Sequence, residues 1–503
     1  MFWMELFGHQ EERLKRAMFY LSLIAGTLGI LLFHFGIFFP IWVSIGIFVI
    51  SASYLVRLVS RHRTGPLSLL IFLVFSLPFI HLVPYLWFDF ASYPDDLWGL
   101  QANPYMTDPA IIELMGMIGA VGVLGFLVGV YQPGQGVFRH QFPASNNLRQ
   151  RTLSIAGFLI LIAIAVAISW ANAPAETIFG ADYTKSKSLI EGFNFPSIWM
   201  FSYILILFCV ADAIFETQQR IRKLKRAVLL AASVIIVFWF QLLRGDRECL
   251  PAVVGGLMMY FVWGTSDHRR KLTSGWKIYC FAIFAAFSIH AISHITGIAR
   301  SALSELTNLS EIPALIDDLI QVGAIRTDSL LSGTWSGVLM TPLSIAGDYL
   351  NGSLAYDYGQ TYLDLLASVI PGFVADFIGY ARPIDGSMGP AWKMTYGIGG
   401  THGVVIPFMA FGMSGVFLIV ALWSFVLSRL ERHVIRKPSI PHLALLGTIV
   451  MAAPHWLWYG EKNILNALTI YLVCLVAYKL SASRGATMQD VNSSCSPAHC
   501  IAK

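Results

Sequence analysis

Long runs of apolar residues dominate the chain, and short polar segments separate them. A helix needs roughly 17 to 25 mostly apolar residues to cross about 30 Å of hydrocarbon. Residues 2–16, in which Phe2, Trp3, Leu6 and Phe7 precede the polar stretch Glu11–Arg16, predict a short helix at the membrane surface. The apolar runs that follow predict twelve membrane-spanning helices, at 18–38, 40–59, 66–88, 110–131, 152–171, 197–215, 227–243, 249–264, 276–296, 404–427, 441–459 and 464–480.

One connection is far longer than the others and lies between the ninth and tenth predicted spans. A structureless loop of that length is unusual in a compact protein, so we expect it to be functional. Its pieces 333–346 and 361–381 are semi-apolar, are interrupted by Gly or Pro, and resemble short surface or re-entrant helices. The expected organisation is spans one to nine in 1–296, a large outer loop in 297–403, spans ten to twelve in 404–480 and an inner tail in 481–503.

Composition and charge agree with this pattern. The chain is 56% hydrophobic and 13% charged, whereas a soluble domain carries about 25% charged residues. This excludes a soluble enzyme, a disordered scaffold and a nucleic-acid binder. With both termini inside, 25 of the 34 basic residues fall on inner segments, as the positive-inside rule requires. The nine that remain outside are Lys185, Lys187, Arg244, Arg247, Arg300, Arg326, Arg382, Lys393 and Lys462.

The most unusual outer charges form the corner Arg244-Gly245-Asp246-Arg247-Glu248 between two spans. Charges at a membrane corner are costly unless they pair with one another or with a ligand. Arginine binds phosphate oxygens bidentately and does not lose its charge, so a pyrophosphate at headgroup level suits this corner. A self-neutralised turn explains the same residues equally well.

Other polar residues have simpler explanations. His290 and His294 have the spacing of two zinc ligands, but no further ligand completes a set, so we expect no metal. Asp212 lies near the inner end of a predicted span, from which it is expected to reach the membrane interface. The pair Cys495 and Cys500 lacks further ligands as well. The chain contains no P-loop and no Asp-x-Asp motif, so we expect no cofactor and no metal-bridged sugar phosphate.

Three stretches resemble the O-antigen polymerase family, the Wzy-type enzymes, and the related O-antigen ligases. The first is Leu243–Glu248, which is similar to the Ser-Arg-Gly corner of that family and places Arg247 in its arginine position. The second is Val369-Ile370-Pro371 followed by Arg382-Pro383, which resembles an Ile-Pro … Lys-Pro signature. The third is Gly400-Thr401-His402 leading into Ala410–Gly415, which resembles a His followed by a Phe-Gly-x-x-Gly turn. The resemblance covers roughly residues 150–480.

The resemblance implies an all-α, GT-C-like membrane glycosyltransferase in a bacterial inner membrane. Its substrates would be glycans on undecaprenyl pyrophosphate, joined on the outer side without metal, with a chain-length regulator and a flippase as partners. Pyrophosphate would be bound by Arg247 and Arg244, with Arg300, Arg326 and Arg382 contributed by the large loop. The acceptor hydroxyl would be deprotonated by His402 or by a carboxylate. The carboxylate candidates are Glu248, Asp348 and Glu461.

Two alternatives stay open. A ligase of the same superfamily would share the donor site and transfer finished glycan to another acceptor. A lipid-linked oligosaccharide flippase or another transporter belongs to a different class, and it should show broken helices or charges at mid-membrane. Aromatic residues of the outer segments either stack on sugars or form the aromatic belt of the interface. They are Tyr356, Tyr358, Tyr362, Trp392 and Tyr396.

Overall fold

In a computed structural model, the part of the chain that is described is 89% helical and contains no strand. The described residues are 2–60, 66–76, 79, 108–131, 152–171, 198–216, 218–236, 252, 255, 256, 259, 311–321, 341–368, 370, 377–379, 402–436, 439–460 and 462–494. The helices are α1 (Phe2–His34), α2 (Ile41–Ser60), α3 (Pro66–Ser76), α4 (Pro109–Val130), α5 (Ile155–Ala171), α7 (Ile198–Phe215), α8 (Gln219–Val234), α12 (Ile312–Gln321), α14 (Gln360–Ser368), α17 (His402–Arg436), α18 (Ile440–Tyr459) and α19 (Lys462–Ser494). A further helical stretch covers residues 341–350.

Five of these helices contain segments that are long and apolar enough to cross a membrane: Arg13–His34, Ile41–Leu58, Pro109–Val130, Gly403–Val434 and Asn463–Ala482. A labelled helix falls on every predicted span except 249–264 and 276–296. The described part of those two ranges consists only of residues 252, 255, 256 and 259. The described helices therefore establish a helical membrane protein, while the count of twelve spans remains a prediction.

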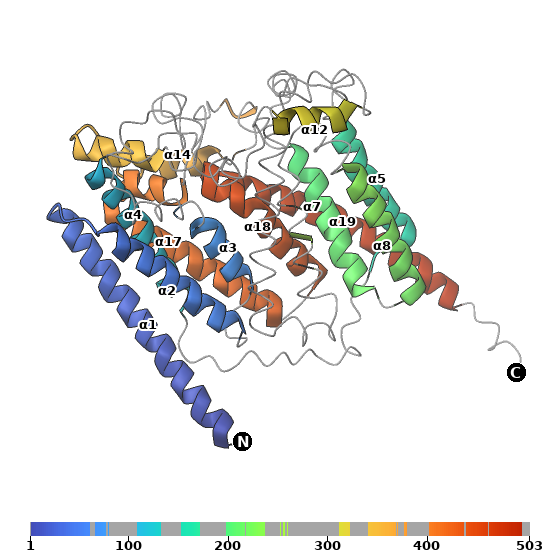
Figure 1. The fold of residues 1–503 in the computed structure, drawn as a ribbon. Helices are drawn as coiled ribbons and strands as arrows, with labels where there is room; N and C mark the ends of the chain where they lie inside the picture. Colours follow the sequence, from blue (N-terminus) through green and yellow to red (C-terminus); the bar gives the residue numbers. More distant parts are fainter. Residues whose placement is uncertain are drawn as a thin grey trace, which may run out of the picture.

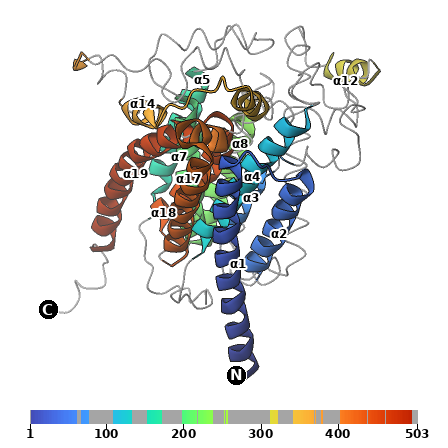
Figure 2. The same cartoon turned by 90° about the vertical axis from the view of Figure 1, so that its left-hand side faces the viewer.

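The bundle is built around α4, which is buried along almost its whole length. Helix α17 lies along α4 (Figures 1 and 2), and glycines permit their close approach. A Cβ atom at Gly125 would meet the carbonyl oxygen of Phe417, and one at Gly129 would meet Ser424. The hydroxyl of Ser424 donates across the interface to the carbonyl of Phe126 at 3.0 Å. Small residues four apart are a common device for packing helices in membranes.

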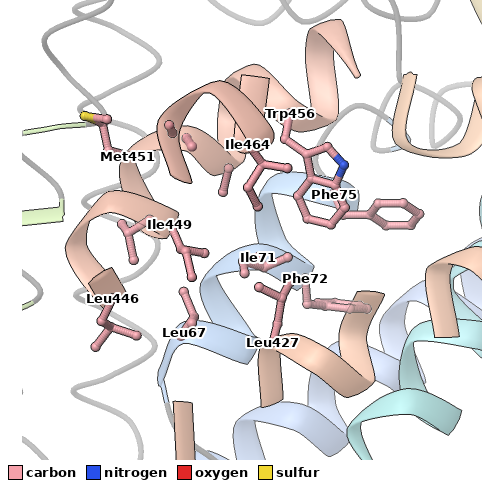
Figure 3. Packing of buried hydrophobic residues seen from close by; sticks show 14 of the residues in the cluster. Leu67, Ile71, Phe72, Phe75, Leu427, Leu446, Ile449, Met451, Trp456 and Ile464 are labelled. Atoms are coloured by element: carbon pink, nitrogen blue, oxygen red, sulfur yellow. The ribbon is translucent and has the colours of Figure 1, made fainter. Parts of the chain in front are cut away.

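Helix α3 is held between α17 and α18. Figure 3 shows Phe72 and Phe75 of α3 beside Leu427 of α17 and Trp456 of α18, all of them buried. The side chain of Glu431, in the last turns of α17, accepts the backbone N–H of Leu67 at 2.6 Å at the start of α3. A carboxylate satisfies the free N–H groups at a helix start and complements its dipole.

The ends of two helices differ from the expectation. The surface helix predicted for residues 2–16 is wrong as a separate element, because α1 runs without interruption from Phe2 to His34. The stretch Glu11–Arg16 is polar, but it contains no Gly or Pro and favours helix. Helix α19 continues to Ser494, beyond the expected end of the last span at 480. Both views show the start of α1 and the end of α19 at one end of the bundle, and α14 at the other (Figures 1 and 2).

Candidate functional site at the break in α17

Of the nine residues expected to bind pyrophosphate or to deprotonate the acceptor, two fall within the described structure. His402 is the first residue of α17, and Asp348 lies in the helical stretch 341–350. The backbone carbonyl of Asp348 accepts the N–H groups of Ser353 and Leu354, which turns the chain after this stretch. The other candidates lie outside the described residues; they are Arg244, Arg247, Glu248, Arg300, Arg326, Arg382 and Glu461.

Helix α17 is interrupted within the Phe-Gly-x-x-Gly segment. Phe411 has φ −144° and ψ 18°, and Gly412 has φ 65° and ψ −154°, so two helical segments meet at this pair. The conformation of Gly412 is one that essentially only glycine adopts. Gly415 is needed as well, because a Cβ atom there would collide with the carbonyl oxygen of Pro407. The fold therefore requires glycine at both positions, at Gly412 for its backbone conformation and at Gly415 for the close approach to Pro407.

The loop 351–359 closes the break. In an uninterrupted helix, the carbonyl of Met409 would accept the N–H of the residue four positions later. At the break, this carbonyl accepts the N–H of Asp357 at 3.2 Å. The carboxylate of Asp357 accepts the N–H of Gly359 at 2.9 Å and the hydroxyl of Thr361, which folds the chain into the start of α14. A segment that is distant in the sequence thus forms a hydrogen bond directly to the backbone beside the break.

Aromatic rings surround the break. Tyr356 lies beside Phe408, with ring centroids 6.4 Å apart, and Tyr362 is parallel to Phe411 at 6.3 Å and 9°. Tyr358 follows at 6.5 Å from Tyr356, and its ring is 83% exposed. Of the non-glycine residues that the structure describes, Tyr358 alone has a positive φ, 49°. Two tyrosines of one predicted outer segment, Tyr356 and Tyr362, therefore meet the Phe-Gly motif of another, and Tyr358 lies next to Tyr356.

The chemistry of this arrangement suits binding of a polar ring compound. Burial, together with the neighbouring Tyr349 and Tyr358, raises the pKa of Tyr356 to about 12. The hydroxyl of Tyr356 is therefore a neutral hydrogen-bond donor at ordinary pH, and the exposed ring of Tyr358 offers a face for stacking. Within the described ranges, no group of three His, Cys, Asp or Glu residues is placed to hold a metal ion.

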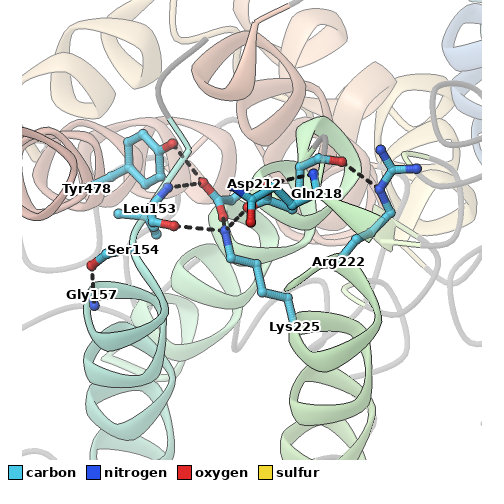
Figure 4. Close-up of polar contacts among 9 residues, drawn as sticks. Leu153, Ser154, Gly157, Asp212, Gln218, Arg222, Lys225 and Tyr478 are labelled. Atoms are coloured by element: carbon cyan, nitrogen blue, oxygen red, sulfur yellow. Dashed lines mark hydrogen bonds and ion pairs between the residues drawn. The ribbon is translucent and has the colours of Figure 1, made fainter. Parts of the chain in front are cut away.

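A second polar cluster is buried among α5, α7, α8 and α19 (Figure 4). The ammonium of Lys225 donates to Asp212 at 2.6 Å, to Glu216 at 2.8 Å and to the carbonyl of Leu153 at 2.9 Å. Asp212 also accepts the hydroxyl of Tyr478 at 3.1 Å. All three ammonium protons have acceptors, so the cluster joins four helices without an unpaired cation.

This cluster corrects the expectation for Asp212. We expected its carboxylate to reach the membrane interface, but the residue is fully buried. Its partner Lys225 stands in a run of five basic residues, Arg220–Arg226, and no local pattern distinguishes it from its neighbours. The helical period places Lys225 alone of these five in the buried face of α8.

Comparisons with protein-family models, with curated proteins and with solved structures found no significant match to this chain. The class that the fold defines is a helical membrane protein with a broken helix and an aromatic cluster at one end.

Proposed function

We propose that this chain is a membrane glycosyltransferase that polymerises oligosaccharide repeat units carried on undecaprenyl pyrophosphate. The observation that supports this most is the break at Phe411–Gly412. It falls in the segment that resembles the family's Phe-Gly-x-x-Gly turn, and it meets Tyr356 and Tyr362 at the α14 end of the bundle. This end is the outer side in the orientation that the basic residues favour.

The proposed reaction is one displacement. A hydroxyl of the incoming repeat attacks the anomeric carbon of the growing chain, and the bond from that carbon to the pyrophosphate oxygen breaks. The hydroxyl proton passes to a base, and undecaprenyl pyrophosphate leaves with the bonding electrons. Because the glycosyl-pyrophosphate bond is already activated, the reaction needs no nucleotide.

Each part of this reaction has a proposed residue. Arg247 and Arg244 bind the pyrophosphate and stabilise the charge that develops on it, because fixed cations are effective where charge forms. His402 is the proposed base, at the start of α17 and on the same segment as the break. Tyr358 is proposed to stack on a sugar ring of the glycan.

The position of the break supports surface chemistry over transport. Discontinuous helices also occur in transporters, where they lie near the bilayer midplane. In α17 the break follows nine helical residues, His402–Ala410, which corresponds to about 13 Å at 1.5 Å per residue. The second segment, from Met413 to Arg436, is much longer. The break therefore lies toward one end of the helix and away from its middle.

A glycan analysis of host cells tests the proposed role of Arg247. Arg247→Ala should abolish long glycan chains while the protein reaches normal levels in the membrane, because the pyrophosphate loses its bidentate ligand. Arg247→Lys should restore chains only in part, since lysine cannot form the fork. Lys185→Ala, in an outer loop, is the matched control and should leave the ladder unchanged. An unchanged ladder in Arg247→Ala would refute the pyrophosphate role.

Deletion of the gene separates the competing functions. A polymerase mutant should display glycans of a single repeat. A ligase mutant should accumulate lipid-linked polymer, and a flippase mutant should retain single repeats on the inner leaflet. Either of the last two outcomes would overturn the proposed polymerisation.

A further inference from the structure

Helix α14 has one face that no other described part of the chain covers. Its Leu365 is buried against the bundle, and its Tyr362 is parallel to Phe411 of α17. On the other side, the side chains of Leu363 and Leu366, three residues apart, are 63% and 65% exposed. Residues three apart lie on the same side of a helix, so the exposed face of α14 is apolar.

Helix α17, which contacts α14, also carries exposed apolar side chains. Phe411, at the break, is half exposed beside Tyr362. Leu418 and Leu422, four residues apart on the second segment of α17, are exposed as well. These two leucines lie within the membrane-spanning segment Gly403–Val434, where an exposed apolar side chain faces lipid. The exposed leucines of α14 therefore belong to a helix that contacts a membrane-spanning helix whose exposed side chains face lipid.

We propose that α14 lies in the outer interface of the membrane, with Leu363 and Leu366 in contact with lipid acyl chains. Both views show α14 at the end of the bundle opposite the start of α1 (Figures 1 and 2). A short helix of this kind lies parallel to the membrane. Its apolar face enters the boundary between headgroups and acyl chains to a depth of about 5–10 Å. Tyr356 and Tyr358, which precede α14, take the headgroup level that tyrosine favours.

This inference does not rest on the proposed enzymatic function, because it uses only the exposed surface and the membrane-spanning helices. It also indicates where the candidate site lies along the membrane normal. The loop 351–359 connects the break in α17 directly to α14, through the bond from Asp357 to Met409. The break therefore lies close to the proposed interfacial helix, on the side of the membrane where the polar group of a lipid-linked ligand would reside.

Spin-label accessibility in liposomes tests the proposal. A single cysteine is placed at Leu366, and in a second variant at Leu363, and each is labelled with a nitroxide. Cys249, Cys280, Cys495 and Cys500 are replaced by serine, while Cys209 and Cys474 are kept because both are buried. The same protein without the new cysteine measures background labelling. Thermal midpoints confirm that each variant is folded.

The controls are Leu422→Cys in the spanning part of α17 and Asn351→Cys, an exposed position in the loop before α14. At Leu366 and Leu363, collisions with oxygen should exceed those with a water-soluble nickel chelate, as at Leu422 but at shallower depth. At Asn351 the nickel chelate should dominate. Nickel-dominated collisions at both α14 positions would overturn the proposal in favour of water. Low accessibility to both reagents would overturn it in favour of a protein contact.

Discussion

Replacing Lys225 by methionine should strongly destabilise the protein. The ammonium of Lys225 is 1% exposed and makes hydrogen bonds of 2.6, 2.8 and 2.9 Å, to Asp212, Glu216 and the carbonyl of Leu153. Removing one partner of a buried ion pair leaves an uncompensated charge and costs about 3–5 kcal/mol. Here two carboxylates lose the same cation, so the upper part of that range is expected.

The measurement is the unfolding of the purified protein in mixed micelles of rising denaturing-detergent content, supported by the thermal midpoint. Lys223→Met is the matched control, because Lys223 is an exposed lysine on the same helix. The double variant Lys225→Met with Asp212→Asn should recover part of the loss, since it removes one of the two unpaired charges. A Lys225→Met variant within about 1 kcal/mol of the parent would refute the account of the cluster.

Three further outcomes are expected. Gly412→Ala should lower the stability of the fold by about 1–3 kcal/mol, which is the strain of a non-glycine residue in that conformation, and it should shorten glycan ladders. The control is Gly46→Ala, in an open helical position, which should be neutral or stabilising. Gly129→Leu should cost about 1–3 kcal/mol by forcing α4 away from Ser424 of α17. Burial opposes ionisation of Glu216, but hydrogen bonds from Lys225 and the Gln218 N–H outweigh it and lower its pKa below 4.5. The ionised carboxylate therefore stabilises the fold above about pH 4.5, and that stability is lost as the pH falls through the lowered pKa.

Thermal midpoints check all three outcomes, and glycan ladders give a second readout for Gly412. For Glu216, the decline in midpoint below pH 4.5 should be smaller in Glu216→Gln than in the parent protein. Equal declines in the two proteins would contradict the pairing with Lys225. A stable Gly412→Ala variant with full-length ladders would show that the break tolerates a side chain. A Gly129→Leu variant as stable as the parent would mean that α4 and α17 do not need their close approach.

Helix positions followed from the sequence where apolar runs are long. The run 110–131 became α4, Pro109–Val130, and the run 40–59 became α2, Ile41–Ser60. Bilayer thickness sets a minimum length for such runs, so composition alone locates them. The apolar run does not locate the start of α1, because the helix continues through the polar residues that precede the run. Polar residues with good helix propensity do not end a helix, and Glu11–Arg16 shows this.

The candidate site could be predicted from the sequence only in part. The glycines at 412 and 415 stood in a recognisable segment, but their contacts with Tyr356 and Pro407 depend on how the chain folds back. The ion cluster joins Leu153, Asp212 and Tyr478, which are far apart along the chain. No local pattern encodes such contacts, because each residue alone has an ordinary explanation at its own position.

Reconstitution tests the central claim most directly. The purified protein is placed in proteoliposomes with lipid-linked repeat units extracted from the deletion strain, without nucleotide and with a metal chelator. The account predicts a ladder of lengthening glycans, with one undecaprenyl pyrophosphate released for each new bond. The ladder should be absent with Arg247→Ala protein. Repeat units that stay single in the presence of folded parent protein would contradict the proposed polymerisation.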